Sequence, residues 1–431
     1  MSVRGGGRGR GRGRGRSRRG ASVGEPEKVA EGILSSESEA DGEELPTLSG
    51  LQLRVLLWYD MRGRRLPWRE TRDPYRIWLS EIMLQQTTVS AVVPYFQRFI
   101  ERFPTVGVLA AAPLEEVLRC WEGLGYYSRA RNLHRAAGLI VSEHGGEFPR
   151  SVEGLTGLPG IGRYTAGAIA AFAWDLPAAI LEANTERLYA RLMCLEESVD
   201  TSAGRKRLWE YAESIVPGER AGEFNQSLMD IGSGICIPKK PQCGECPLWD
   251  YCAARRAGRE QELPRRRPRV GITELSELAV VLESGGRVLV RRRGMGERWA
   301  GMYDFPRLEL SESQRELLPE AERLVVRGRG RVRGRSGSLF AGMDEGLSGE
   351  LGVLVESITG VRPLELLGSV SLTYSVTRFR VSLVAIRCRY DGEGELRDDF
   401  SWQDAGVLDG LPMPTAARQI VGWLRDERKG V

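Results

Sequence analysis

The feature that most constrains this chain is a group of four cysteines in one short segment, spaced C-x6-C-x2-C-x5-C. They are Cys236, Cys243, Cys246 and Cys252. In a chain without a recognisable secretion signal, such clustering indicates metal ligation before disulfides. Four thiolates at short loop separations can surround one compact metal centre. The segment therefore predicts a metal-bound loop within the fold.

Two kinds of centre accept four cysteines, a zinc ion and a [4Fe–4S] cluster. A zinc ribbon usually pairs two C-x2-C knuckles, whereas only Cys243 and Cys246 form one here. The spacing therefore favours a [4Fe–4S] cluster, with a structural zinc knuckle as the alternative. The chain has only two histidines, His134 and His144. Their scarcity excludes histidine-rich zinc sites and most Ser-His or Cys-His triads.

Composition divides the first 273 residues into three segments. Residues 1–47 are an Arg-Gly tract followed by an acidic stretch, which predicts a disordered tail that binds nucleic acid nonspecifically or has no specific role. Residues 48–258 carry apolar residues at spacings of three and four, which predicts helices. Residues 259–273 form a basic, proline-marked linker. No apolar run is long enough for a membrane span, so we expect a soluble, intracellular protein.

After the linker the periodicity changes to that of strands. Residues 277–283 and 287–293 alternate around Ser284-Gly285-Gly286, a hairpin signal, and residues 414–425 have a helical pattern. An Arg/Gly-rich insertion near residues 311–346 is expected to be a surface loop between strands. Residues 274–431 therefore predict a second domain of mixed α/β structure. The 431 residues suffice for such a multidomain arrangement.

A glycine-rich turn between two helical patterns predicts a clamp for DNA. The segment from Leu155 to Gly167 contains Leu158, Gly160 and Gly162, followed by small residues. Glycines at such a turn let one helix end and another begin with its backbone N–H groups exposed to an anion. This is the arrangement of a helix-hairpin-helix that binds a DNA phosphate. Alone the turn could be a simple connection.

Two glutamates predict acid–base chemistry. In a helix, Glu81 would share a face with Ile77 and Trp78, and desolvation raises the pKa of such a carboxyl, as a general acid requires. Glu182 and Asn184 precede a predicted helix, whose N-terminus favours an ionised carboxylate. One proton donor and one lasting negative charge are what cleavage of a glycosidic bond requires. Taken singly, each glutamate would be an ordinary surface or helix-start residue.

Together these residues resemble the MutY family of adenine DNA glycosylases, within the endonuclease III-like superfamily. The resemblance is dense from about Leu51 to Gly258, and residues 299–306 look like the start of the family's second domain. It rests on motifs that follow one another in the family's order. These are Leu66-Pro67-Trp68-Arg69, Pro74-Tyr75, residues 78–87, residues 123–133, the helix-hairpin-helix segment and the four cysteines.

The resemblance implies an all-helical helix-hairpin-helix glycosylase module with an iron–sulfur loop, followed by a Nudix-like α/β domain. It implies that a monomer removes adenine opposite 8-oxoguanine or guanine from double-stranded DNA, wherever the cell keeps its DNA. Glu81 would protonate adenine and Glu182 would stabilise the positive sugar, with Tyr164 and Asn184 beside them. Lysine occupies position 164 in bifunctional relatives, so tyrosine implies a monofunctional glycosylase. The implied contacts to DNA are Arg69 (a phosphate or active-site partner), Gln86, Thr87, Tyr126, Leu158, Gly160 and Gly162.

Two departures from the family pattern affect catalysis and recognition. Glu182-Ala183 stands where the family has aspartate and glycine, which extends the carboxylate by about 1.5 Å. Tyr374 and Ser375 are followed by Val376 where the family reads 8-oxoguanine with Phe-Ser-His. A Nudix hydrolase box is not found, so the second domain is expected to read DNA. These departures leave two alternatives, a same-fold glycosylase for another lesion and a pseudoenzyme that binds the mispair.

Overall fold

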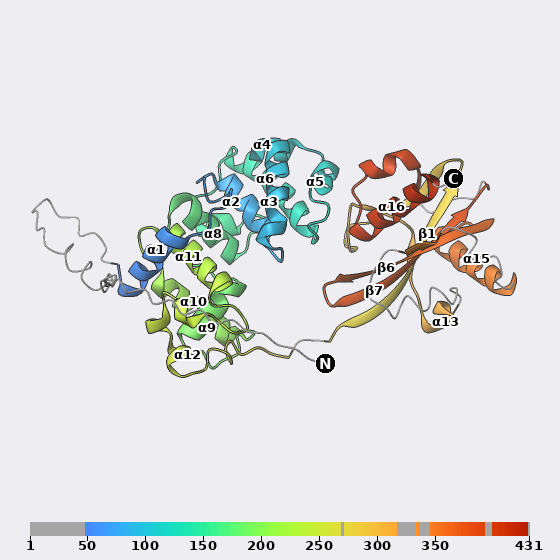
Figure 1. Ribbon diagram of the computed structural model, residues 1–431. Helices are drawn as coiled ribbons and strands as arrows, with labels where there is room; N and C mark the ends of the chain where they lie inside the picture. Colours follow the sequence, from blue (N-terminus) through green and yellow to red (C-terminus); the bar gives the residue numbers. More distant parts are fainter. Residues whose placement is uncertain (1–47, 269–270, 317–332, 336–344, 393–398, 430–431) are drawn as a thin grey trace, which may run out of the picture. The chain divides into compact units, whose positions relative to one another are not determined.

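The computed structural model describes residues 48–268, 271–316, 333–335, 345–392 and 399–429. The chain from Leu48 onward forms one compact unit, in which a helical part is followed by an α/β part (Figure 1). The predicted tail and most of the predicted insertion lie outside the described residues.

Helices make up the first part, as the periodicity predicted. They are α1 (Gly50–Arg62), α2 (Pro74–Leu84), α3 (Val89–Arg102), α4 (Val106–Ala111), α5 (Leu114–Cys120), α6 (Ser128–His144), α7 (Val152–Thr156), α8 (Arg163–Trp174), α9 (Ala183–Leu192), α10 (Ser202–Ile215), α11 (Ala221–Gly234) and α12 (Ala253–Arg256). Single 3-10 turns, η2 (Cys243–Glu245) and η3 (Trp249–Tyr251), lie in the cysteine segment.

Local sequence explains where α2 begins and how closely α8 packs. Asp73 caps α2 by accepting a hydrogen bond from the backbone N–H of Tyr75 at 2.9 Å, and Pro74 occupies the first turn. The small residues of α8 allow close packing. A Cβ on Gly167 would lie 2.5 Å from the carbonyl oxygen of Ala179. The small-residue run therefore brings α8 against its neighbours.

Two apolar cores support the helical part. One gathers α2, α3, α6 and α8 around Trp78, Phe99 and Trp121, and the other gathers α1, α9 and α11 around Tyr189 and Phe224. Each of these aromatic side chains is almost fully buried. Burying such a side chain contributes about 1.5–3 kcal/mol relative to exposing it. The catalytic candidates on α2, α8 and α9 are therefore attached to a well-packed scaffold.

The second part is a mixed sheet. Its strands are β1 (Thr273–Ser284), β2 (Arg287–Arg292), β3 (Tyr303–Asp304), β4 (Arg307–Glu309), β5 (Arg333–Arg335), β6 (Glu365–Val376), β7 (Phe379–Arg389) and β8 (Phe400–Asp404). Their order is β3-β2-β1-β7-β6-β5, with β4 on β1 and β8 on β2. The predicted hairpin joins β1 to β2 antiparallel, whereas β1 and β7 run parallel.

Helices cover both faces of this sheet. Alternate residues of β1 point to opposite faces, so Ala279 and Val281 pack in the core with α16 (Thr415–Lys429), and Leu278 and Val280 pack with α15 (Glu345–Thr359). A short helix α13 (Glu312–Arg315) and a 3-10 turn η4 (Ala405–Gly410) complete the described elements. Figure 1 shows α15 and α16 on either side of the long strands.

Two connecting segments differ from the expectation. Residues 333–335, predicted to lie in a surface loop, form β5 and pair with the edge of β6, which offers free backbone groups. The basic linker is not a free tether in its first half. Leu263 is buried, and the backbone N–H of Val199 donates to the Arg265 carbonyl at 3.1 Å. The segment therefore packs along the helical part.

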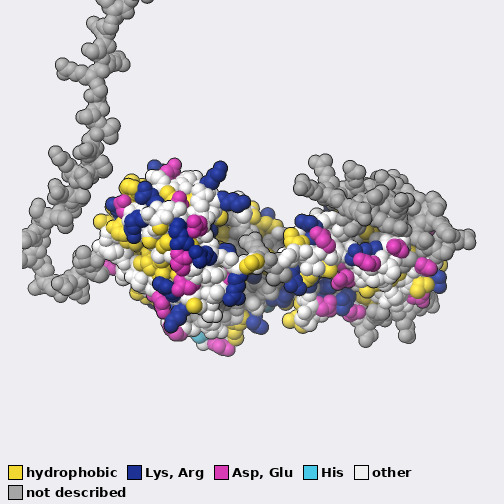
Figure 2. Space-filling model, turned by 90° about the horizontal axis from the view of Figure 1, so that it is seen from below, with side chains coloured by type: hydrophobic (Ala, Val, Ile, Leu, Met, Phe, Trp, Pro, Cys, Tyr) yellow, Lys and Arg dark blue, Asp and Glu magenta, His cyan; other side chains and the backbone are white. Residues whose placement is uncertain are grey.

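Charged side chains of both signs cover the surface. Figure 2 shows arginine and lysine side chains interspersed with acidic ones over the visible face of the described residues. This mixing agrees with the small formal net charge of +4. No helix among the described residues has the length and apolar character needed to cross a membrane.

Candidate active site

A cavity of about 930 Å³ opens between α2, α8, α11 and the start of α9. All four predicted catalytic side chains line it, although more than a hundred residues of sequence separate the first from the last. They are Glu81, Tyr164, Glu182 and Asn184. The cavity also receives Gln86 and Thr87 from the segment after α2. The structure therefore brings the candidate catalytic residues together with two predicted DNA contacts.

Glu81 has the environment of a proton donor. It is 3% exposed on α2, and the hydroxyl of Tyr164 donates to its Oε2 at 2.6 Å. Burial raises the pKa of Glu81 to about 7, while the Tyr164 hydrogen bond and the charge of Arg69 oppose the rise. A carboxyl with this pKa carries its proton for much of the time near neutral pH. The predicted direction of the shift is confirmed.

Glu182 caps the start of α9. Its Oε1 accepts from the backbone N–H of Thr185 at 2.8 Å, and its Oε2 accepts from Nδ2 of Asn184 at 3.1 Å. These donors and the charge of Arg187 stabilise the ionised carboxylate. Burial outweighs them, so the pKa of Glu182 is raised from its ordinary value. The group is desolvated as well as capped, so the predicted ionised state of Glu182 stays a prediction.

Arg69 lies inside the site and not on its surface. Its guanidinium donates two hydrogen bonds to the carboxylate of Asp230, at 2.8 and 2.9 Å, and only 7% of its side chain is exposed. It also lines the cavity beside Glu81, whose pKa it lowers. This position favours an active-site partner over a phosphate ligand, and both roles stay predictions. Sequence reasoning missed Asp230, which lies 161 residues away from Arg69.

A second buried arginine joins two segments that carry predicted DNA contacts. Arg129 on α6 donates to the carbonyl oxygens of Ile82 and Gln85, both at 2.6 Å, and to that of Leu124 at 3.1 Å. Its guanidinium lies 5.7 Å from the ring centre of Tyr126. The end of α2 and the turn that carries Tyr126 are thereby held together. Sequence reasoning included Arg129 in a matched motif but assigned it no role.

The exposed residues of these segments have unusual backbone conformations. Gln86 has φ of 59° and Tyr126 has φ of 47°, both in the left-handed region that non-glycine residues rarely adopt. Tyr126 is 44% exposed although its flanking residue Tyr127 is buried. Arg129 satisfies the carbonyl groups around both turns, which holds them in place. Both side chains are therefore fixed where a duplex could reach them.

The helix-hairpin-helix turn forms between α7 and α8. Gly160 has φ of 80°, and a Cβ there would lie 2.8 Å from Cβ of Asn132, so the position needs glycine. Gly162 is the exposed N-cap of α8. Leu158 is 5% exposed and packs in the core, so any DNA contact there uses its backbone and not its side chain. The turn can offer N–H groups to a phosphate.

The four cysteines line one small cavity beside α9. Burial, together with the charges of neighbouring cysteines, raises the pKa of the Cys246 thiol to about 12. Such thiols would give up their protons at neutral pH only beside a cation. Four cysteines around one cavity form a donor set that suits a metal centre. The sulfurs surround the cavity without closing on a point: no three His, Cys, Asp or Glu side chains among the described residues are placed to hold one ion.

Arginines connect this cavity to the active site. Arg191 donates to Sγ of Cys236 at 3.2 Å and to the Leu263 carbonyl at 3.0 Å. Arg187, one turn earlier on α9, donates to the Cys236 carbonyl at 2.6 Å and to Oδ1 of Asn184 at 3.0 Å. The cysteine loop and the N-terminal turn of α9 are therefore held by one set of hydrogen bonds.

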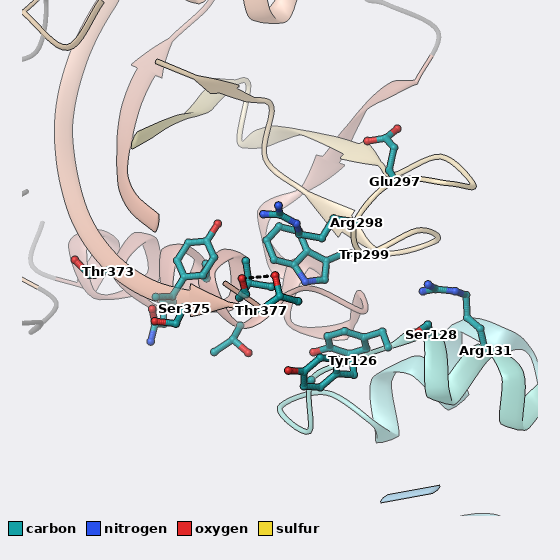
Figure 3. A pocket seen from close by; sticks show the side chains of 16 residues that line it. Tyr126, Ser128, Arg131, Glu297, Arg298, Trp299, Thr373, Ser375 and Thr377 are labelled. Carbon is teal, nitrogen blue, oxygen red and sulfur yellow. Dashed lines mark hydrogen bonds between the residues drawn. The ribbon is translucent and has the colours of Figure 1, made fainter. Parts of the chain in front are cut away.

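The predicted lesion-reading residues lie in a second cavity, of about 470 Å³ (Figure 3). Tyr374 lines it, but its hydroxyl donates to Glu277 at 3.0 Å and accepts from Arg307 at 3.1 Å, so this polar atom is already engaged. Ser375 is exposed and also lines the cavity, as does Tyr126. The structure thus brings both predicted reading residues near a predicted DNA contact of the helical part.

Comparison with known families agrees with this geometry. Residues 79–214 match the HhH-GPD superfamily of base excision DNA repair proteins. Residues 236–252, which include all four cysteines, match the iron–sulfur binding domain of endonuclease III. The predicted helix-hairpin-helix glycosylase fold and iron–sulfur cluster are thereby confirmed.

Several curated proteins are similar to the chain. The adenine DNA glycosylase of Buchnera aphidicola subsp. Schizaphis graminum is 38% identical over 256 residues, which cover 59% of this chain and 74% of that protein. The adenine DNA glycosylase of Mycolicibacterium smegmatis is 41% identical, over 48% of this chain and 70% of that protein. The human one is 40% identical, over 48% of this chain and 40% of that protein.

Solved structures are similar over about half of the chain. A thermostable thymine-DNA glycosylase has a TM-score of 0.45 at 31% identity, covering 48% of this chain and 95% of that one. A non-covalent endonuclease III–DNA complex has a TM-score of 0.41 at 25% identity, covering 49% of this chain and 99% of that one.

Proposed function

The chain belongs to the adenine DNA glycosylase family, and on this premise we propose that it removes adenine paired with 8-oxoguanine, or with guanine, from double-stranded DNA. The observation that carries the proposal is the pairing of two differently placed carboxyls in one cavity. Glu81 is buried under the Tyr164 hydroxyl, and Glu182 is held by backbone and amide donors. Base excision needs one proton donor and one negative charge.

In the proposed reaction, adenine leaves the duplex and enters the cavity of about 930 Å³. Glu81 protonates the adenine ring, which turns the base into a better leaving group. Its pKa of about 7 supports this role, because the proton is present near neutral pH and the group remains acidic enough to give it up. Tyr164 keeps the carboxyl oriented through its 2.6 Å hydrogen bond.

Glu182 then stabilises the positive charge that develops on the sugar, directly or through a transient covalent bond, before water completes hydrolysis. Asn184 fixes the carboxylate, and Arg187 in turn fixes Asn184. Position 164 holds tyrosine and not lysine, so an amine for a Schiff base is missing at that position and a monofunctional glycosylase is proposed. An iron–sulfur cluster held by Cys236, Cys243, Cys246 and Cys252 would fix the loop beside α9.

For the residues after the linker we propose a Nudix-like domain that reads the base opposite adenine. The mixed sheet with helices on both faces supports this assignment, and Tyr374 and Ser375 are placed at one end of β6. We propose that the first domain, predicted to end near residue 258, is followed by a linker whose first half packs on it, and that the second domain begins near residue 274. We further propose that the protein acts as a monomer in the compartment that contains DNA.

A panel of duplexes tests the function directly. Single-turnover release of adenine is measured for A:8-oxoguanine, A:G and A:T pairs, with release of thymine from G:T as a comparison. We expect adenine release from the first two pairs. Binding without base release would instead indicate a mispair-binding pseudoenzyme, and release of another base would indicate a glycosylase for a different lesion.

A further inference from the structure

The cavity at the end of β6, the strand proposed to read the base opposite adenine, contains an arginine with unused hydrogen-bond donors. Arg298 lines this cavity together with Ser375 and Tyr126 (Figure 3). Its side chain is 37% exposed, and among the residues that the structure describes it meets one acid, Glu277, at 4.0 Å. That distance is the outer limit of an ion pair. Most of its N–H donors therefore remain free for a ligand.

Aromatic rings hold this guanidinium in place. It lies 5.7 Å from the ring centre of Trp299 and 5.6 Å from that of Phe379. Trp299 is itself fixed, because Arg293 and Arg307 lie 5.3 and 5.5 Å from its ring and because it packs against the core of the helical part. Cation–π contacts of this kind position an arginine without consuming its in-plane donors.

Three neighbouring polar groups already have partners within the protein. The Tyr374 hydroxyl is engaged by Glu277 and Arg307. The Thr377 hydroxyl donates to the carbonyl oxygen of Val376 at 2.7 Å. Arg131, the other arginine of the cavity, donates to the Ala300 carbonyl at 2.9 Å. Unlike these groups, Arg298 has no polar partner closer than Glu277 at 4.0 Å among the described residues, and the exposed hydroxyl of Ser375 shares its cavity.

We propose that Arg298 is a specificity-determining residue that donates hydrogen bonds to the purine opposite the excised adenine. Guanine presents O6 and N7 as acceptors, to which arginine binds in bidentate fashion. In 8-oxoguanine, N7 carries a hydrogen and C8 carries an oxygen, so O6 and O8 accept. The guanidinium finds acceptors on both bases, whereas only 8-oxoguanine offers Ser375 an N–H donor at N7.

This division of labour rests on the proposed function and has a consequence for selectivity. Arg298 recognises the opposite purine without distinguishing the lesion, and Ser375 adds the preference for 8-oxoguanine. The planar walls of Tyr126 and Trp299 suit a flat base. A backbone phosphate is the competing partner for a guanidinium, and it would give sequence-independent binding.

Binding measurements separate these partners. Dissociation constants are measured in the Glu81→Gln background, to limit base release, for A:8-oxoguanine, A:G and A:T duplexes. We expect Arg298→Met to weaken binding to the first two duplexes by a similar factor, roughly tenfold, and to change A:T binding much less. Arg298→Lys keeps the charge but loses the planar fork, and should also weaken mispair binding.

A matched control is Arg378→Met. Arg378 lies 5.1 Å from the same Phe379 ring but does not line the cavity, so its loss should leave the three affinities unchanged. Thermal unfolding and iron content verify that each variant is folded. An equal loss on all three duplexes would assign Arg298 to a phosphate and overturn the proposal, as would full retention of mispair binding in Arg298→Lys.

The proposed function is tested separately by the unmodified protein. If that protein releases no adenine, the function fails whatever Arg298 binds. If it releases adenine from A:8-oxoguanine and A:G while Arg298→Met binds all duplexes like its parent, the Arg298 inference alone fails.

Discussion

The two cavities of this protein differ in whether their charged side chains are bonded within the protein or left exposed. In the helical part, Arg69 and Arg129 are buried and bonded to Asp230 and to backbone carbonyls. In the cavity at the end of β6, Arg298 and Ser375 keep polar groups exposed. Catalysis needs a carboxyl whose pKa and position are fixed by its surroundings, whereas recognition needs free donors and acceptors. We therefore expect the first cavity to serve catalysis and the second to serve recognition.

The largest expected effect concerns the catalytic cavity and tests the role of Glu81. Glu81→Gln keeps the size and the hydrogen bond to Tyr164 but cannot donate a proton, so base release should fall by at least about a hundredfold. Duplex binding should persist, because Glu81 is only 3% exposed. Single-turnover release and equilibrium binding are measured on the same A:8-oxoguanine duplex. Parental rates in this variant would show that another group supplies the proton.

The second prediction concerns the cysteine loop. Protein purified without oxygen should be brown and contain about four irons per chain, and Cys243→Ser should lose iron and most DNA affinity. Arg187 and Arg191 link this loop to Asn184, so distortion of the loop also reaches the active site. Metal analysis and duplex binding are the measurements. Cys388→Ser, a buried cysteine of the sheet, is the matched control. Stoichiometric zinc without iron would contradict the prediction.

Sequence patterns identified much of the catalytic cavity because its key residues lie in contiguous motifs. Glu81 and Tyr164 belong to segments whose helices and turn can be predicted from the spacing of nearby residues. In the structure the Tyr164 hydroxyl donates to Oε2 of Glu81 at 2.6 Å. Asp230 could not be found in this way, because nothing local marks it as the partner of Arg69. Its role depends on α11 packing beside the loop that follows α1, a tertiary contact across 161 residues.

The same limit applies to the sheet. The hairpin of β1 and β2 was readable from Ser284-Gly285-Gly286, since a hairpin is a local structure. The parallel pairing of β1 with β7 joins residues about a hundred positions apart, so it cannot be predicted from a turn between the two strands. The position of Arg298 beside Ser375 follows from this topology and was likewise not predictable.

A third prediction tests whether the position of the Glu182 carboxylate limits the rate. Glu182→Asp restores the family residue, and aspartate is a favourable helix N-cap that can still accept from the backbone of Thr185. We expect retained or increased single-turnover release, because a shift of about 1 Å toward the family position can change the rate up to a hundredfold. Glu182→Gln, which removes the charge, is the matched control and should be severely impaired. A complete loss in Glu182→Asp would show that the local backbone has adapted to glutamate.

The fourth prediction concerns pH. Burial raises the pKa of Glu81 to about 7, so release should decline as pH rises above that value. The Tyr164 hydrogen bond lowers this pKa, so Tyr164→Phe should move the alkaline limb of the rate profile to higher pH. A purely structural role would lower the rate at every pH without moving the limb. Single-turnover rates between pH 5 and about 9 decide between these outcomes.

The smallest expected effect lies on the recognition side. Tyr374→Ala with Ser375→Ala removes one aromatic wall and one hydroxyl, and a lost hydrogen bond costs about 1 kcal/mol. The preference for A:8-oxoguanine over A:G should therefore shrink severalfold, while release from A:G changes less. Val376→His, which introduces the family histidine, should increase the preference. Rates and affinities are compared on both duplexes for the parent and both variants. If the double variant discriminates as well as its parent, β6 does not read the lesion, and the proposed contrast between engaged charges in one cavity and free donors in the other loses its basis.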